Sequence, residues 1–467
     1  MKSKFAALFL LFATVFVLAS CLSTDDNYTY TDDSAITSFS ISSGKQYLHV
    51  KSSTGGDSIV TKDITLSSYK FYIDQVKGEI YNPDSLPCGI DATKLLCTVS
   101  SSNSGVVVIK NIDSDTLKYI TTTDSVDFSQ QREIQVYSNS MTGIRKYKVT
   151  VNVHKEFADS FAWHAMPVCE ALKSLKAVRA IAINGKMLLF GNDGTYTRLF
   201  VSEGNGWNES NTLFDADTYR SVVEKEGVAY LCNGGNIISS ADGSSWTTEA
   251  TATSITRLVA ASRFRIYGYA IDGRLMASAD NGKTWSVSTI DDELSLLPTD
   301  ETAYVSIPVK TNSLTDRVLL IGSRDKSLYP SDTTPHIWSK IDEGADNSNN
   351  QPWNYYTIAE ENKHTAPLLN GISAIYYDSQ LLMMGCKNDE KPTSYKSLDN
   401  GITWKVDTTT LILPDNFAFG EVATGSATAY TVAADKKNVL WLVNAKNGMT
   451  WRGRINRLGW KDEQTSF

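Results

Sequence analysis

Short segments in which apolar and polar residues alternate recur between residues 36 and 155. The clearest is the run Tyr147, Val149, Val151 and Val153, where every second residue is aromatic or β-branched. This period of two is typical of strands with one buried face. Turn-forming residues separate the segments, so the pattern predicts a small antiparallel β-sandwich over residues 36–155.

A second pattern begins after residue 155 and recurs six times. Each unit has an opening strand, a strongly apolar second strand, a third strand and, in most units, a turn that ends near a Trp. The second strands span residues 187–191, 228–232, 265–268, 318–322, 381–385 and 439–443. Such repeats are typical of radial β-architectures. We therefore expect an all-β chain in which residues 156–467 form a six-bladed β-propeller.

The sixth unit is one strand short, because only seven residues follow Trp460. Residues 161–163, just before the first unit, are apolar and aromatic and end in Trp163. We expect them to supply the missing outer strand, with Trp163 in the place of the Trp that ends the other turns. Ring closure of this kind removes sheet edges that would otherwise pair with other chains.

Three turns share one motif, which reads Ser-x-Asp-Asn-Gly-x-Thr-Trp at 278–285 and 397–404 and is shortened at 240–246. Asp bonds its own backbone in turns, and Gly takes the left-handed conformation. The motif resembles the Asp-box of sialidase-type β-propellers, a structural element of the propeller rim. The resemblance implies that each Asp holds a hairpin turn and that each Trp packs beneath it. The residues concerned are Asp242, Trp246, Asp280, Trp285, Asp399 and Trp404.

The first 20 residues have a basic start and an apolar run that is short for a membrane span, as in a signal peptide. The sequence Leu-Ala-Ser-Cys at 18–21 resembles a bacterial lipobox, which implies cleavage before Cys21 and lipidation of its thiol. The alternative is an ordinary secretory signal with an incidental Cys. Residues 21–35 are polar and predict a flexible tether.

Acidic residues closely follow Cys21 and resemble the surface-export signal of Bacteroidota lipoproteins. The last hairpin of the predicted sandwich resembles those of cadherin-like and immunoglobulin-like modules. Together with the propeller motifs, these features resemble an uncharacterised family of Bacteroidota surface lipoproteins. The resemblance implies an outer-membrane lipoprotein that is exposed at the cell surface and held to the membrane by its lipid.

The charge balance argues against nucleic acid as a partner. The chain has 44 Lys and Arg against 52 Asp and Glu, which gives a net charge of −8. Nucleic-acid binding needs a strongly positive face. The five His and six Cys show no metal-ligand spacing, and no phosphate-binding or nucleophile motif is present. We expect no metal and no cofactor.

Three arginines, Arg179, Arg220 and Arg257, occupy matching positions at the start of three successive repeats. The starts of opening strands lie near the central channel of a propeller, where three guanidiniums could bind a carboxylate or sulfate. The alternative is that each Arg bridges to the next blade, because repeated positions normally carry repeated structure.

The longest predicted loop, residues 340–368, contains a polar run followed by Trp353, Tyr355 and Tyr356. Exposed aromatic residues can stack on sugar rings or anchor a protein partner. The alternative is that these rings pack on a blade.

The sequence favours a non-catalytic surface module that binds a glycan or a protein. We identify no catalytic residues, since neither a Tyr–Glu pair nor two facing carboxylates can be placed. Two alternatives stay open. One is a sialidase-like or other glycan-cleaving propeller enzyme, and the other is a scaffold subunit of an outer-membrane complex.

Overall fold

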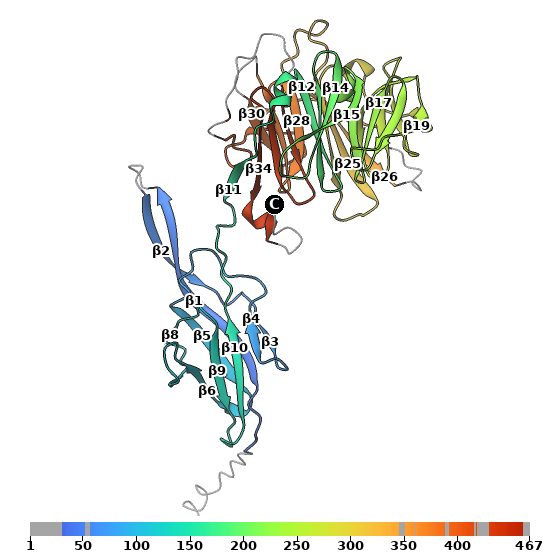
Figure 1. The fold of residues 1–467 in the computed structure, drawn as a ribbon. Coiled ribbons are helices and arrows are strands. Elements are labelled where there is room, and N and C mark those ends of the chain that lie inside the picture. Colours follow the sequence, from blue (N-terminus) through green and yellow to red (C-terminus); the bar gives the residue numbers. More distant parts are fainter. Residues whose placement is uncertain are drawn as a thin grey trace, which may run out of the picture. The chain divides into compact units, whose positions relative to one another are not determined.

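The computed structural model describes residues 30–51, 57–344, 351–359, 361–387, 392–414, 417 and 429–460. It divides into two compact units, 1–158 and 159–467, which are described separately below (Figure 1). In the described residues, strands and short 3-10 helices are the regular elements. None of the helices found there is long and apolar enough to cross a membrane.

The first unit contains two sheets. One has the order β2-β1-β5-β8, with β1 (Ile36–Lys51), β2 (Asp57–Thr65), β5 (Leu95–Ser101) and β8 (Ser125–Val126). The other has the order β3-β4-β10-β9-β6-β7, with β3 (Tyr72–Asp74), β4 (Glu79–Tyr81), β10 (Ile144–Thr150), β9 (Arg132–Tyr137), β6 (Val106–Lys110) and β7 (Leu117–Tyr119). A 3-10 turn, η1 (Ser102–Ser104), follows β5.

A single hydrophobic core joins these two sheets into a β-sandwich. Ile36 and Phe39 of β1 pack in the same buried cluster as Ile134 of β9 and Tyr147 of β10. The predicted alternation is visible on β10, where Tyr147 is buried and Lys148 is exposed. Alternation places every second side chain in the core, which is why this segment forms half-buried strands.

The second unit is a propeller of six four-stranded sheets (Figure 1). Blade one contains β12 (Ala177–Ile183), β13 (Lys186–Asn192), β14 (Tyr196–Ser202) and β15 (Asn208–Asp215). Blade two contains β16 (Val222–Lys225), β17 (Val228–Asn233), β18 (Asn236–Ser240) and β19 (Thr247–Thr251). Blade three contains β20 (Ile255–Ala261), β21 (Ile266–Ala270), β22 (Leu275–Ser278) and β23 (Ser286–Val287).

Blade four contains β24 (Thr302–Pro308), β25 (Thr315–Gly322), β26 (His336–Glu343) and β27 (Asn354–Tyr355). Blade five contains β28 (Asn370–Tyr377), β29 (Gln380–Cys386), β30 (Thr393–Ser397) and β31 (Lys405–Val406). Blade six contains β32 (Tyr430–Ala434), β33 (Leu440–Asn444), β34 (Met449–Ile455) and β11 (Phe161–Ala165). Three 3-10 turns lie between these strands, η2 (Glu170–Ser174), η3 (Thr218–Ser221) and η4 (Leu294–Leu296), and a fourth, η5 (Asn456–Gly459), follows β34.

The ring closes through β11, which is the outer strand of the sixth blade. It pairs antiparallel with β34, so that Phe161 lies opposite Ile455 and Trp163 opposite Gly453. The indole Nε1 of Trp163 donates to the carbonyl of Ile412 at 2.6 Å. This pairing confirms the predicted closure.

The three turns that resemble Asp-boxes are built around their Asp side chains. The carboxylate of Asp280 accepts the N–H of Thr284 at 2.8 Å and the hydroxyl of Ser278 at 2.8 Å. The turn at Asp399 makes the same pattern of bonds. Gly282 has a φ of +92°, and a Cβ there would lie 2.6 Å from Ile237 of the preceding blade. The turn therefore needs glycine both for its backbone conformation and for its packing.

Candidate functional site

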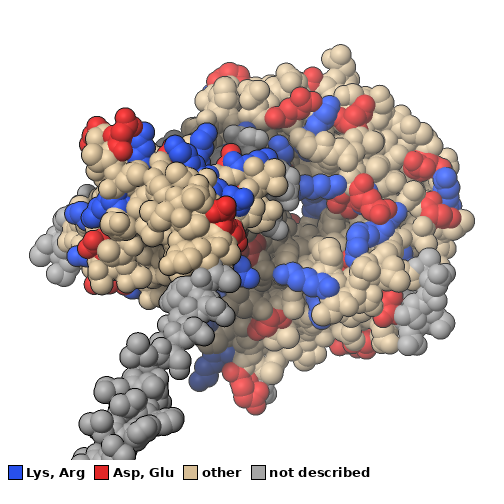
Figure 2. All heavy atoms as spheres, turned by 90° about the horizontal axis from the view of Figure 1, so that it is seen from below, with Lys and Arg blue, Asp and Glu red and all other residues tan. Residues whose placement is uncertain are grey.

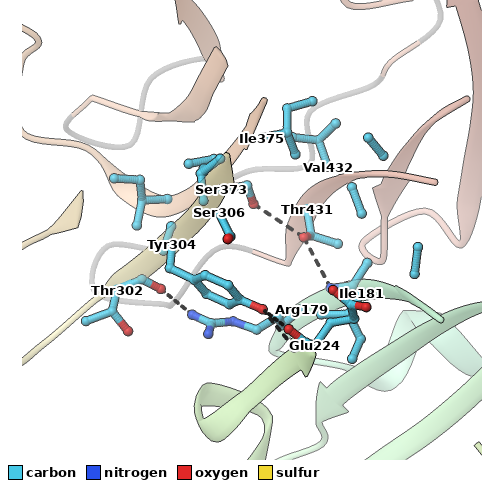
Figure 3. Close-up of a pocket in the computed structure, with 18 of the residues that line it drawn as sticks. Arg179, Ile181, Glu224, Thr302, Tyr304, Ser306, Ser373, Ile375, Thr431 and Val432 are labelled. Atoms are coloured by element: carbon cyan, nitrogen blue, oxygen red, sulfur yellow. Dashed lines mark hydrogen bonds between the residues drawn. The ribbon is translucent and has the colours of Figure 1, made fainter. Parts of the chain in front are cut away.

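The centre of the propeller encloses a cavity of about 730 Å³. Its walls come from the inner strand of each of the six blades, and the close-up in Figure 3 shows side chains from several of them converging on it. The face of the ring visible in Figure 2 is hollowed, and both basic and acidic side chains lie around the hollow. A volume of this size is within the roughly 300–1,000 Å³ typical of small-molecule sites.

The three arginines named from the sequence meet at one end of this cavity. Arg179 donates to the carbonyls of Thr302 and Arg220, the latter at 3.3 Å. Arg220 donates to the carbonyl of Asp300 and, at 3.1 Å, to its carboxylate. Arg257 donates to the same Asp300 carbonyl at 3.1 Å. All three guanidiniums thus reach the segment 299–302, which leads into β24.

Not all three arginines line the cavity itself. Arg179 and Arg220 do, whereas Arg257 is not part of the lining, and its guanidinium carbon lies 5.5 Å from the centre of the Tyr269 ring. Arg220 is in the 3-10 turn η3 just before β16, not on an opening strand as the repeat pattern predicted. The role of the three residues in ligand binding stays a prediction.

The positive charge of this cluster is only partly compensated. Burial, together with the nearby charges of Arg220 and Arg179, lowers the pKa of Arg257 to about 10. Burial also lowers the pKa of Arg179, again with a contribution from Arg220. Because like charges disfavour each other's ionised forms, these shifts identify a group of guanidiniums held close together.

Tyr304 of β24 lines the cavity beside Arg179 (Figure 3). Figure 3 shows its ring and the Arg179 guanidinium reaching the same part of the cavity from opposite walls. The phenol accepts the backbone N–H of Glu224 at 2.7 Å and donates to the carbonyl of the same residue at 3.3 Å. Burial raises the pKa of Tyr304, and the nearby Glu224 carboxylate raises it further.

Small hydroxyl side chains from blades five and six line another part of the cavity wall. The hydroxyls of Ser373 and Thr431 lie 3.3 Å apart, and Thr431 accepts the N–H of Ala180 at 3.4 Å (Figure 3). Thr302 is 3% exposed, and its hydroxyl has no hydrogen-bond partner among the described residues. A wall of this kind can exchange hydrogen bonds with a polar ligand.

The carboxyl groups of Glu301 and Glu224 lie toward different ends of the cavity. Glu301 precedes β24, near the arginines, whereas Glu224 lies toward the end of β16 that leads to Lys225. Burial raises the pKa of both. Each is already bonded to backbone, since Glu224 accepts the N–H of Gly227 at 2.5 Å and Glu301 that of Ile372 at 3.1 Å. No group of three or more potential metal ligands occurs in the described part of the chain.

The structure shows where the aromatic residues Trp353, Tyr355 and Tyr356 of the predicted loop lie, and it corrects the expectation that Trp353 is exposed to a ligand. Trp353 is fully buried, its indole donates to Ser288 at 3.1 Å, and it cannot contact a ligand. Tyr355 is half-buried in β27 and bonds His336 through its hydroxyl at 3.1 Å, while Tyr356 packs against the core of the next blade. Residues 353–356 therefore form the outer strand region of blade four, not a projecting loop. Most of the polar run before them lies outside the described residues.

The fold and the cavity define a six-bladed β-propeller protein with an N-terminal β-sandwich. The chain belongs to the family described as the DUF6242 β-propeller domain, whose model matches residues 157–463. The model of the DUF6242 N-terminal domain, a domain of unknown function, matches residues 39–151. No curated protein sequence matches the chain.

Several solved structures resemble the chain in general fold. A protein of unknown function from Bacteroides thetaiotaomicron has 11% identity and a TM-score of 0.40 over 82% of this chain and 98% of that chain. A DUF4623 family protein from Bacteroides eggerthii has 10% identity and a TM-score of 0.30 over 90% and 98%. The six-bladed fungal lectin of Aleuria aurantia has 14% identity and a TM-score of 0.38 over 59% and 90%. Values this low carry no argument about function.

Proposed function

We propose that this protein is a non-catalytic binding module and that its ligand, a glycan, binds in the central cavity of the propeller. The observation that carries the proposal is the cavity itself, which all six inner strands enclose and line with arginines, tyrosines and hydroxyl groups. Specific small-molecule sites combine an enclosed volume with a few convergent polar groups. A cavity of about 730 Å³ suits the end of a saccharide chain better than the surface of a folded protein.

The proposal includes a place for the protein in the cell. Lipidation at Cys21 would hold the mature chain at the outer membrane, and the acidic residues that follow would direct it to the outer surface. The propeller would then meet extracellular glycans. This part is supported by the sequence of the first 35 residues alone, since Cys21 lies outside the described residues.

A non-catalytic role is supported by the state of the groups in the cavity. A nucleophilic phenol needs a base beside it or a lowered pKa. The phenol of Tyr304 instead bonds the backbone of Glu224, and its pKa is raised. The carboxyl groups of Glu224 and Glu301 are each bonded to a backbone amide. None of these groups is arranged as an activated nucleophile.

A glycan-cleaving enzyme is the second candidate. It is favoured by one observation, that Arg179, Arg220, Tyr304 and Glu224 all line the same cavity. It predicts that the protein releases products from the saccharides it binds, whereas the binding module releases none.

Both candidates can be tested with the lipid-free mature chain and a panel of neutral, uronic-acid, sialylated and sulfated oligosaccharides. We expect saturable binding without product release. The Ser306→Trp variant, which places an indole in the cavity, should abolish binding. Ser286→Trp, on the exposed outer strand β23, is the matched control and should bind as the wild type does. Binding that survives Ser306→Trp would contradict a site in the cavity.

A further inference from the structure

The end of the cavity lined by Arg179 and Arg220, with Arg257 bound to the same segment 299–302, has a specific chemistry of its own. We infer that it binds the acidic group, a carboxylate or sulfate, of a saccharide ligand whose hydroxyl groups extend along the cavity. This inference rests on the proposed function and names the class of ligand. Its evidence is the charge of the arginine cluster, its unused donors and the wall beside it.

The cluster has more positive than negative charge. Its hydrogen bonds go mostly to backbone carbonyls of the segment 299–302, which carry no net charge. Within the described residues, Asp300 is its one direct carboxylate partner, through Arg220, and that side chain is 41% exposed. Glu301 is turned to β28, where its carboxyl group accepts the N–H of Ile372. An anion placed between the guanidiniums would complete the charge balance that Asp300 provides only in part.

Some donors of the arginine cluster are not used by the protein. A guanidinium has five N–H groups. In the described residues, Arg220 uses only Nη2, on Asp300, which leaves the N–H groups on Nε and Nη1 for a ligand. The carbonyl bonds also fix the planes of the guanidiniums, so that little side-chain entropy is lost when an oxyanion binds.

A buried hydroxyl close to the arginines supports a polar ligand at this end. The carbonyl of Thr302 is bound by Arg179, yet the Thr302 hydroxyl, on a residue only 3% exposed, has no partner among the described residues. Buried hydroxyls normally find a partner, and Thr302 is part of the cavity wall, so its hydroxyl is a candidate partner for a polar ligand.

The rest of the wall combines small hydroxyl side chains with Ala, Ile and Val side chains, a mixture that fits a saccharide. Ser306, Ser373 and Thr431 present small hydroxyls and Tyr304 presents a ring to the same space (Figure 3). A saccharide can exchange hydrogen bonds with these hydroxyl side chains, and one of its rings can lie against an aromatic side chain. A peptide that ends in a free carboxylate shares the acidic group but not this pattern of hydroxyls.

The test uses pairs of ligands that differ in charge and little else. Calorimetry with the mature chain compares trigalacturonate with its methyl ester, 3′-sialyllactose with the methyl ester of its sialic acid, and a sulfated with an unsulfated carrageenan oligosaccharide. We expect at least one acidic member to bind about 10-fold or more tightly than its neutral partner, as a charged hydrogen-bonded pair provides. Arg220→Gln should remove that advantage, and Arg220→Lys should restore part of it.

Arg198→Gln is the matched control, because Arg198 pairs with Glu209 on the outer part of blade one, away from the cavity. It should leave every affinity unchanged. Equal binding of charged and neutral partners that Ser306→Trp abolishes would overturn the inference and leave the proposed function standing. Binding that Ser306→Trp does not affect would overturn the proposed function itself. Failure of all acidic saccharides to bind, or tighter binding of a peptide with a free C-terminal carboxylate, would also overturn the inference.

Discussion

Arg263, in the turn between β20 and β21 of blade three, donates from Nε and Nη2 to one oxygen of Asp316 on β25 of blade four, at 2.9 and 2.6 Å. The other oxygen of Asp316 accepts the backbone N–H of Arg263 at 2.9 Å. The Asp316 side chain is fully buried, whereas the Arg263 side chain is 36% exposed. A second pair nearby, Arg265 with buried Asp342, joins the same two blades. These contacts lock one inter-blade boundary next to the cavity.

Removal of the Arg263 side chain should therefore destabilise the propeller strongly. Arg263→Ala leaves the buried carboxylate of Asp316 without its charged partner, and we expect a loss of about 3 kcal/mol in the free energy of unfolding. Denaturant titration measures it. Arg274→Ala is the control, because Arg274 and its partner Asp272 are both about half exposed, and it should cause no measurable change. Equal effects of the two variants would contradict a clamp between the blades.

The closing strand can be tested at Gly453. A Cβ at this position would lie 2.7 Å from the carbonyl oxygen of Ala162 and 2.7 Å from the ring of Phe161, both on β11. Gly453→Ala should push β11 from β34 and lower stability by about 1–3 kcal/mol, the usual cost of overpacking. Gly344→Ala, where the nearest atom would be at an ordinary 3.4 Å, is the matched control. Limited proteolysis should then cut the Gly453→Ala variant near residues 159–165 first, and resistance there would argue against closure through β11.

The turn at Asp280 predicts a pH dependence. Burial alone would raise the pKa of Asp280, but hydrogen bonds from Thr284 and Ser278 lower it to about 2. The folded-state pKa is thus below the unfolded value, so the stabilisation is present above about pH 4 and is lost as the pH falls toward 2. The stability difference between the wild type and Asp280→Asn should shrink between about pH 5 and about pH 2. A difference that stays constant over this range would mean that the ionised carboxylate does not hold the turn.

The architecture could be predicted from the sequence because each repeat contains its own strand and turn pattern. An apolar second strand in every unit and the pairing of 161–163 with the last unit follow from side-chain patterns alone. The meeting of the three arginines on segment 299–302 could not be predicted, since it depends on how blades one to four curve around the channel. The sequence also left two alternatives open for Trp353, because the polar residues before it indicate a loop whereas its ring can equally pack on a blade. The structure has the second, since Trp353 forms a bridge with Ile290 and packs edge-on against Tyr267 in the core.

Membrane attachment is a separate prediction of the proposed function. Cells that express the full chain and grow on a labelled fatty acid should incorporate the label into the protein, and Cys21→Ala should abolish this incorporation. The wild type should be sensitive to protease added to intact cells. A Cys21→Ala variant that stays labelled would exclude lipidation of this thiol, and protection of the wild type from external protease would place it on the inner side of the membrane.

The central claim is that a saccharide binds inside the ring. Amide hydrogen exchange of the mature chain, with and without the tightest-binding saccharide of the panel, tests this most directly. We predict slower exchange in peptides that cover β12, β24 and β28, whose residues line the cavity. Protection confined to outer strands such as β15 and β19, or to the N-terminal sandwich, would contradict it.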